Sequence, residues 1–125
     1  MPIRVLLVDD DRLVRDMYRT ALSNAGFDVT VARDGQDAID AMTRTLPAAV
    51  VLDVQMPRVD GLGVLTWMRD IARVDVPVIV LTNSGGRRTR KAAEKLGINS
   101  WLVKAETLPR RLVDVVREVA RVRTL

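Results

Sequence analysis

Short apolar runs and longer helical patterns alternate along the chain. Five runs carry apolar side chains at most consecutive positions, which is typical of strands buried on both faces. They span residues 3–8, 29–31, 49–52, 78–81 and 101–103. A strand exposed on one face would instead alternate apolar and polar positions. The runs therefore predict five buried strands.

The segments between these runs predict five helices. Apolar residues recur with a helical period from Leu13 to Ala25 (Leu13, Val14, Met17, Tyr18, Ala21, Leu22 and Ala25), and Gly26 follows as a stop. Asp34 and Asp60 are suited to cap the second and third helices. The fourth helix is expected over residues 87–96 and has a weak apolar stripe. It ends at Gly97, and the last helix is expected to begin at Thr107, with Pro109 in its first turn.

The later helices each have an expected inward face, defined by the same helical spacing. These positions are Ala38, Ile39, Ala41 and Met42 on the second helix, Leu62, Leu65, Met68 and Ile71 or Ala72 on the third, and Leu108, Leu112, Val115, Val116 and Val119 on the last.

The alternation of strands and helices predicts a doubly wound α/β fold. Such chains pair their strands in parallel through right-handed crossovers, with helices on both faces of an open sheet. The chain has 125 residues and shows no internal repeat or linker. We therefore expect one domain over residues 1–125. Ligands of such folds bind beyond the carboxyl ends of the strands.

Composition narrows the chemistry that this fold can perform. Hydrophobic residues make up 48% of the chain but aromatic residues only 3%, so the core must be mainly aliphatic. Cysteine and histidine are both absent, which excludes disulfides, thiolate catalysis and imidazole ligands. No apolar run approaches the roughly 20 residues of a membrane span, and no secretory signal is present, so we expect a cytoplasmic protein. The net charge of +4 is interpreted as a solvated basic surface.

Polar residues of different kinds follow four of the expected strands. Asp9 and Asp10 end the first strand, Asp53 the third, Thr82 the fourth and Lys104 the fifth. Because the carboxyl ends of parallel strands meet at one edge of the sheet, we expect these side chains to lie close together.

Three carboxylates within a few ångströms of one another repel, and a hard divalent cation compensates them. Mg²⁺ binds one or two carboxylates and completes its coordination with water and phosphate oxygens. Asp9, Asp10 and Asp53 therefore predict a Mg²⁺ site with room for a phosphoryl group. A carboxylate can itself accept a phosphoryl group as an acyl phosphate. Lys104 and Thr82 are suited to bind the phosphoryl oxygens.

This ordered set resembles the receiver domain of two-component response regulators. The matching stretches are residues 5–10, residues 51–57 with Asp60 and Gly61, residues 80–82 and residues 102–104. The resemblance covers the whole chain and implies the flavodoxin-like strand order 2-1-3-4-5.

The resemblance also implies roles for single residues. Asp53 would accept the phosphoryl group from a sensor histidine kinase or phosphotransfer protein. Asp9, Asp10 and Asp53, with the backbone carbonyl of Gln55, would hold Mg²⁺, while Thr82 and Lys104 would bind the phosphoryl group as members of the catalytic set. The domain would catalyse only its own phosphorylation and dephosphorylation, so we do not class it as an enzyme.

Phosphorylation would then change the face formed by the fourth helix, fifth strand and fifth helix. That face would control a downstream protein or output domain, and it allows a phosphorylation-dependent homodimer. Neither direct nucleic-acid binding nor membrane binding is expected. Trp101 stands where the family often has an aromatic switch residue, and core packing remains an equal alternative. Ala105 replaces the proline that usually follows the lysine, so the Lys104–Ala105 bond is expected to be trans.

Other interpretations of the same residues remain to be weighed. The acids of residues 9–11 are also suited to capping a helix, and Asp11 is the one expected to do only that. A phosphohydrolase of the haloacid-dehalogenase type would use a similar set, but it would leave Asp53 without a role. Nucleic-acid binding through the arginines lacks both a helix-turn-helix pattern and aromatic stacking surface. The basic residues at 87–95 and 110–123 suit a solvated face or an acidic partner.

Overall fold

In the computed structural model, the backbone is described for residues 2–56, 59–83 and 86–124, and side chains are described up to residue 120. Its strands form one parallel five-stranded sheet with the order β2-β1-β3-β4-β5. This order confirms the predicted doubly wound fold. The strands are β1 (Arg4–Val8), β2 (Asp28–Ala32), β3 (Ala49–Leu52), β4 (Val78–Thr82) and β5 (Ser100–Val103).

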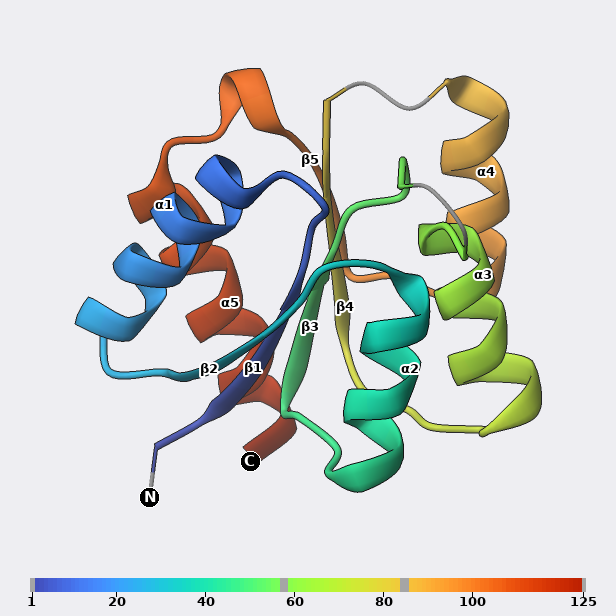
Figure 1. The fold of residues 1–125 in the computed structure, drawn as a ribbon, viewed down its shortest axis with the longest axis horizontal. Helices are drawn as coiled ribbons and strands as arrows, with labels where there is room; N and C mark the ends of the chain where they lie inside the picture. Colours follow the sequence, from blue (N-terminus) through green and yellow to red (C-terminus); the bar gives the residue numbers. More distant parts are fainter. Residues whose placement is uncertain (1, 57–58, 84–85, 125) are drawn as a thin grey trace.

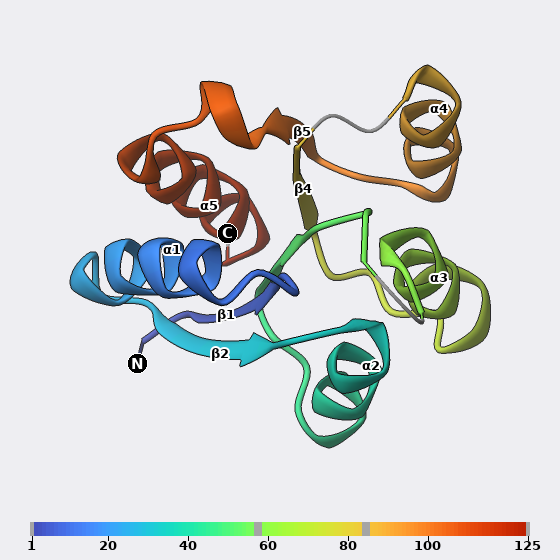
Figure 2. The same ribbon diagram turned by 45° about the horizontal axis from the view of Figure 1, so that its top comes forward.

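Helices cover both faces of the sheet. They are α1 (Arg12–Asn24), α2 (Gly35–Arg44), α3 (Gly61–Thr66), α4 (Arg87–Leu96) and α5 (Pro109–Thr124), with a π-helical turn η1 (Trp67–Ile71) and a 3₁₀ turn η2 (Lys104–Glu106). Helices α1 and α5 lie on one face, and α2, α3 and α4 lie on the other (Figures 1 and 2). No helix in the described part of the chain is long and apolar enough to span a membrane.

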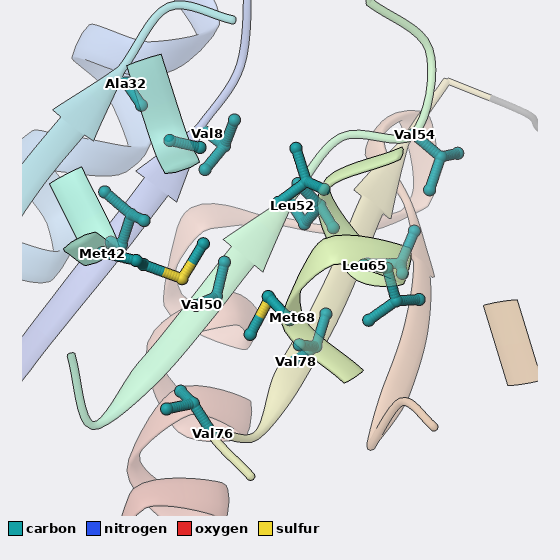
Figure 3. Close-up of a cluster of buried hydrophobic side chains, with 14 of the residues drawn as sticks. Val8, Ala32, Met42, Val50, Leu52, Val54, Leu65, Met68, Val76 and Val78 are labelled. Carbon is teal, nitrogen blue, oxygen red and sulfur yellow. The ribbon is translucent and has the colours of Figure 1, made fainter. Parts of the chain in front are cut away.

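The core is divided into two layers by the sheet, as the period of two along a strand requires. Val5 and Leu7 of β1 pack in the layer beneath α1 and α5. Leu6 and Val8 pack in the opposite layer, which Figure 3 shows in close-up with side chains from β3, β4, α2, α3 and η1. Every residue of β3 and β4 is buried. The central strands therefore fix the position of whatever follows them.

The predicted capping residues and glycines set the helix boundaries where the sequence placed them. The Oδ1 atom of Asp34 accepts a hydrogen bond from Asp37 N at 2.8 Å, and that of Asp60 accepts one from Gly63 N at 2.9 Å. Gly26 and Gly97 end their helices with positive φ angles of 98° and 107°, which glycine adopts without steric cost. All of the described peptide bonds are trans, including the bond before Ala105, as predicted.

The predicted inward faces of the third and last helices are wrong at one end each, where the residues are exposed. Ile71 is 70% exposed and Ala72 is exposed, because the third helix continues as the π-helical turn η1. Ala72 N donates to Trp67 O, five residues earlier, and this wider turn changes the direction in which Ile71 points. The last helix begins at Pro109 rather than at Thr107, and Leu108 precedes it with 59% exposure.

The first helix also buries less of its apolar stripe than its period suggests. Leu13 is 80% exposed and Met17 is 46% exposed, whereas Tyr18 and Leu22 are buried. The helix therefore packs on the sheet along a narrower face than the sequence pattern indicates.

Candidate functional site

The predicted polar residues meet at the carboxyl edge of the sheet, the upper edge in Figure 1. Asp9 follows β1 and Asp53 follows β3, and the preceding residues Val8 and Leu52 are partners in the sheet register. Asp53 N donates to Val8 O at 3.0 Å, which extends the ladder to the acid itself. One carboxylate oxygen from each of Asp9, Asp10 and Asp53 lies within 4.8 Å of the other two. Asp9 and Asp53 are buried, and Asp10 is exposed.

Lys104 joins the two buried acids. Its Nζ lies 2.7 Å from Asp9 Oδ2 and 3.0 Å from Asp53 Oδ2, and its side chain is only 9% exposed. The other carboxylate oxygens accept backbone hydrogen bonds, because Asp9 Oδ1 binds Asp11 N and Asp53 Oδ1 binds Gln55 N, each at 2.9 Å. Each buried carboxylate therefore has one charged and one backbone partner, as buried charges require.

Burial and pairing act in opposite directions on these charges. Burial raises the pKa of Asp9 above its ordinary value, and the hydrogen bond from Lys104 only partly offsets this. Burial alone would lower the pKa of Lys104, but its bonds to the two carboxylates raise the pKa above the ordinary value. The proton therefore stays on the lysine, and the site presents an ammonium group between two acids.

Thr82 has an unusual environment for a hydroxyl group. It is fully buried at the end of β4, and its partner in the sheet register is Val103, the residue before Lys104. No described residue makes a hydrogen bond with its Oγ1. A buried hydroxyl without a partner is costly, and such atoms are often explained by a ligand or a solvent molecule.

The start of α3 approaches the acid-bearing loop closely. A Cβ atom on Gly61 would lie 2.3 Å from Asp53 O and 2.4 Å from Val54 Cα, so only glycine fits there. This close approach gives a physical reason for the Asp60-Gly61 pair of the sequence motif. Residues 57 and 58 of the same motif lie outside the described residues.

The sequence predicted that Asp11 only caps a helix, and it left two alternatives for Trp101, core packing and a switch residue. The Oδ1 atom of Asp11 accepts from Leu13 N at 3.0 Å and Val14 N at 3.3 Å, which confirms it as the cap of α1. Trp101 is half-buried and packs against the core beneath α2–α4, and the Arg90 guanidinium lies 5.7 Å from its ring centroid. This arrangement is consistent with both packing and switching.

Sequence reasoning missed the supporting roles of Arg15 and Tyr18 and the contact of Tyr18 with Thr107. Arg15 Nη1 donates to Asp9 O, and Tyr18 Oη donates to Thr107 O, each at 2.9 Å. Tyr18 was interpreted only as part of an apolar stripe. Its hydroxyl was the available signal, because a buried tyrosine usually needs a hydrogen-bond partner.

The charge and the donor atoms of the site fit a divalent cation. Three carboxylates and one ammonium leave a formal charge of −2 at the edge of the sheet. The available ligands are carboxylate oxygens, which hard cations such as Mg²⁺ prefer.

A doubly wound parallel sheet with three acids and a lysine at its carboxyl edge is the class of α/β fold that can hold a cation and a phosphoryl group there. Comparison with known families gives the particular one: the model described as "Response regulator receiver domain" matches residues 5–117. The chain belongs to the receiver-domain family of two-component response regulators.

Individual proteins agree with this family. The chain is 44% identical over 104 residues to "Response regulator MprA" of Mycolicibacterium vanbaalenii, covering 83% of this chain and 45% of that protein. The chain thus spans about half the length of the curated relatives it matches. The Francisella response regulator 1452 receiver domain has a TM-score of 0.87 and 28% identity, with 98% of this chain and 99% of that one covered. Vibrio cholerae chemotaxis protein CheY4 has a TM-score of 0.86 and 27% identity, with 95% of this chain and 99% of that chain covered.

Membership of this family fixes the general function. Receiver domains act in phosphorylation-dependent signalling and typically use Mg²⁺ at the acidic pocket. Response regulators generally interact with histidine kinases and output domains. The haloacid-dehalogenase alternative is set aside, because the family match runs through all four strand ends that carry the polar residues.

Proposed function

We propose that this chain, over residues 1–125, is a receiver domain that is switched by phosphorylation of Asp53. The observation that carries the proposal is the buried Asp53 carboxylate, which is bound to Lys104 and has Asp9 and Asp10 within reach of a common cation. Of these three acids, Asp53 lies at the end of the strand in the middle of the sheet. A phosphoryl group on Asp53 would lie next to the Lys104 ammonium group and to the site that Asp9 and Asp10 form for a cation.

In the proposed transfer, a carboxylate oxygen of Asp53 attacks the phosphorus of a phosphohistidine on a sensor kinase or phosphotransfer protein. A P–O bond forms, the P–N bond breaks, and the imidazole leaves with the electron pair and takes up a proton. Lys104 pairs with a phosphoryl oxygen, and the Thr82 hydroxyl donates to another. Hydrolysis by water returns Asp53 to the carboxylate and releases phosphate. Positioning and charge compensation provide most of the catalysis in such transfers.

Asp9, Asp10, Asp53 and the backbone carbonyl of Gln55 are the proposed Mg²⁺ ligands. The cation, when bound, neutralises charge on the phosphoryl oxygens. The formal charge of −2 supports a divalent ion in this role, because one such ion balances it. Lys104 bridges the two buried acids, Asp9 and Asp53, through its ammonium group.

The proposed output surface is formed by α4, β5 and α5. Trp101 of β5 lies beside the basic helix α4 through its contact with Arg90, so a movement at Thr82 has a short route to this surface. We propose that a downstream protein, an output domain or a second copy of the chain recognises this surface, and that nucleic acid is not bound directly.

The test is the intact mass of the protein after incubation with acetyl phosphate, with and without Mg²⁺. Wild type should gain one phosphoryl group, about 80 Da, only with Mg²⁺. Asp53→Asn should gain none. The matched control is Asp40→Asn on the exposed face of α2, which should behave as wild type. A gain that persists in Asp53→Asn would refute the assignment of the acceptor.

A further inference from the structure

Helix α1 contacts the backbone on both sides of the acidic pocket. Arg15 and Tyr18 are three residues apart and therefore lie on the same face of the helix. Arg15 Nη1 donates to the carbonyl oxygen of Asp9, and Tyr18 Oη donates to that of Thr107. The second contact joins residues 89 positions apart and is buried, with Tyr18 only 1% exposed.

Thr107 in turn holds the turn that carries Lys104. Its Oγ1 donates to Val103 O at 2.7 Å, and its backbone N donates to Lys104 O at 3.2 Å. Thr107 therefore binds the backbone carbonyls of both Val103 and Lys104, and it is itself only 7% exposed. Tyr18 anchors this residue to α1, so the side chain of Lys104 starts from a fixed backbone.

The turn η2 has little to stabilise it from within. It is a single 3₁₀ turn of three residues, Lys104–Glu106, and such turns have poor hydrogen-bond geometry. Ala105 and Glu106 are exposed, so neither side chain is buried in the core. Ala105 also lacks the ring that would restrict the backbone if a proline followed the lysine. Thr107 therefore restrains the turn both through the single 3₁₀ hydrogen bond that its backbone N makes and through the bond of its side chain to Val103 O.

We propose that Tyr18 and Thr107 are positioning residues that hold the Lys104 ammonium group on Asp9 and Asp53. Their effect on phosphoryl transfer rests on the proposed function of the site. Their effect on Lys104 itself does not, because the two ion pairs are present without any phosphoryl group. Burial also raises the pKa of the Tyr18 phenol, so the hydroxyl stays neutral and remains a donor.

Lysine ammonium resonances in the nuclear magnetic resonance spectrum test the proposal directly. The chain has only three lysines, and Lys91 and Lys95 are exposed, so a slowly exchanging ammonium signal is expected from Lys104 alone and should vanish in Lys104→Arg. Tyr18→Phe keeps the aromatic ring and removes the hydroxyl that binds Thr107 O. Thr107→Val removes the threonine hydroxyl that binds Val103 O. Both should shift or broaden the signal, whereas Thr107→Ser should restore it.

The matched control is Thr43→Val on α2. Thr43 Oγ1 donates to Ile39 O, four residues earlier, as Thr107 does to Val103, but it lies far along the chain from the site. This variant should leave the signal unchanged. A Lys104 signal that is identical in Tyr18→Phe, Thr107→Val and wild type, or that is absent from wild type, would overturn the proposal.

Phosphorylation by acetyl phosphate gives the second measurement. Tyr18→Phe and Thr107→Val should slow it about three- to tenfold, the effect of one weakened hydrogen bond. The same substitutions should have no further effect in a Lys104→Ala background, because they act through that residue. Additive losses would contradict the proposal. A wild type that shows the Lys104 signal but takes up no phosphoryl group would refute the proposed function while leaving the positioning role intact.

Discussion

The unpaired hydroxyl of Thr82 leads to a prediction in which stability and function change in opposite directions. A buried hydroxyl without a partner costs about 1–3 kcal/mol of folding free energy. Thr82 is fully buried, and its Oγ1 finds no partner among the described residues. Thr82→Val replaces that hydroxyl by a methyl group of similar size. We therefore expect the free energy of unfolding to rise by about 1 kcal/mol, and the midpoint of thermal unfolding by about 4 °C.

Thr107→Val is the matched comparison, because it makes the same change at the other buried threonine near the site. Thr107 Oγ1 has a partner, Val103 O, at 2.7 Å. Its removal leaves a carbonyl without that hydrogen bond. We expect Thr107→Val to lower the free energy of unfolding by about 1–2 kcal/mol. Identical substitutions at two buried threonines should thus have effects of opposite sign.

Urea denaturation of wild type and both variants, without Mg²⁺, measures the two differences. The same preparations should be tested for phosphorylation by acetyl phosphate, where Thr82→Val should be slower because a donor to the phosphoryl group is lost. Loss of more than about 1 kcal/mol in Thr82→Val would refute the reasoning, since it would mean that the hydroxyl has a stabilising partner in the free protein.

Two further predictions concern the residues that surround the acids. Lys104→Ala leaves two buried carboxylates without their ammonium partner and should lower the free energy of unfolding by about 3 kcal/mol. Urea titrations with and without Mg²⁺ should show that the metal ion stabilises this variant more than wild type. Equal stabilisation of the two proteins would contradict the charge argument. Gly61→Ala places a Cβ 2.3 Å from a backbone oxygen and should cost about 2 kcal/mol or more. Gly86→Ala meets no atom within 4 Å and should cost about 1 kcal/mol or less by the same thermal or urea measurement.

The sheet and the meeting of the polar residues were predictable because both depend on simple repeats. Consecutive apolar positions correctly indicated the buried strands β3 and β4, whereas the edge strands β2 and β5 are only partly buried, because each has a neighbouring strand on one side only. Parallel strands bring their carboxyl ends to one edge of the sheet. The approach of Asp9, Asp53 and Lys104 follows from that geometry alone. Caps such as Asp34 and Asp60 were predictable for a different reason, since a cap and its target are only three residues apart.

The features that sequence reasoning missed depend on contacts between distant segments. The helical period extends through Ile71, but the chain there forms a π-helical turn. Arg69 of that turn donates to Gly97 O, 28 residues away, as well as to Val74 O, so the geometry is tied to the end of α4. The contact of Tyr18 with Thr107 is of the same kind. Periodicity within one segment carries no information about such partners.

The free protein carries two energetic costs at one edge of its sheet. One is the formal charge of −2 that Lys104 leaves uncompensated, and the other is the buried hydroxyl of Thr82. A divalent cation would relieve the first, and a phosphoryl oxygen would provide the partner for the second. If the proposed function holds, binding of the cation and of the phosphoryl group is therefore favoured by the same two energetic costs that lower the stability of the free protein. Substitutions that remove either cost should stabilise the fold and weaken the switch, and for this reason stability and phosphorylation need to be measured on the same variants.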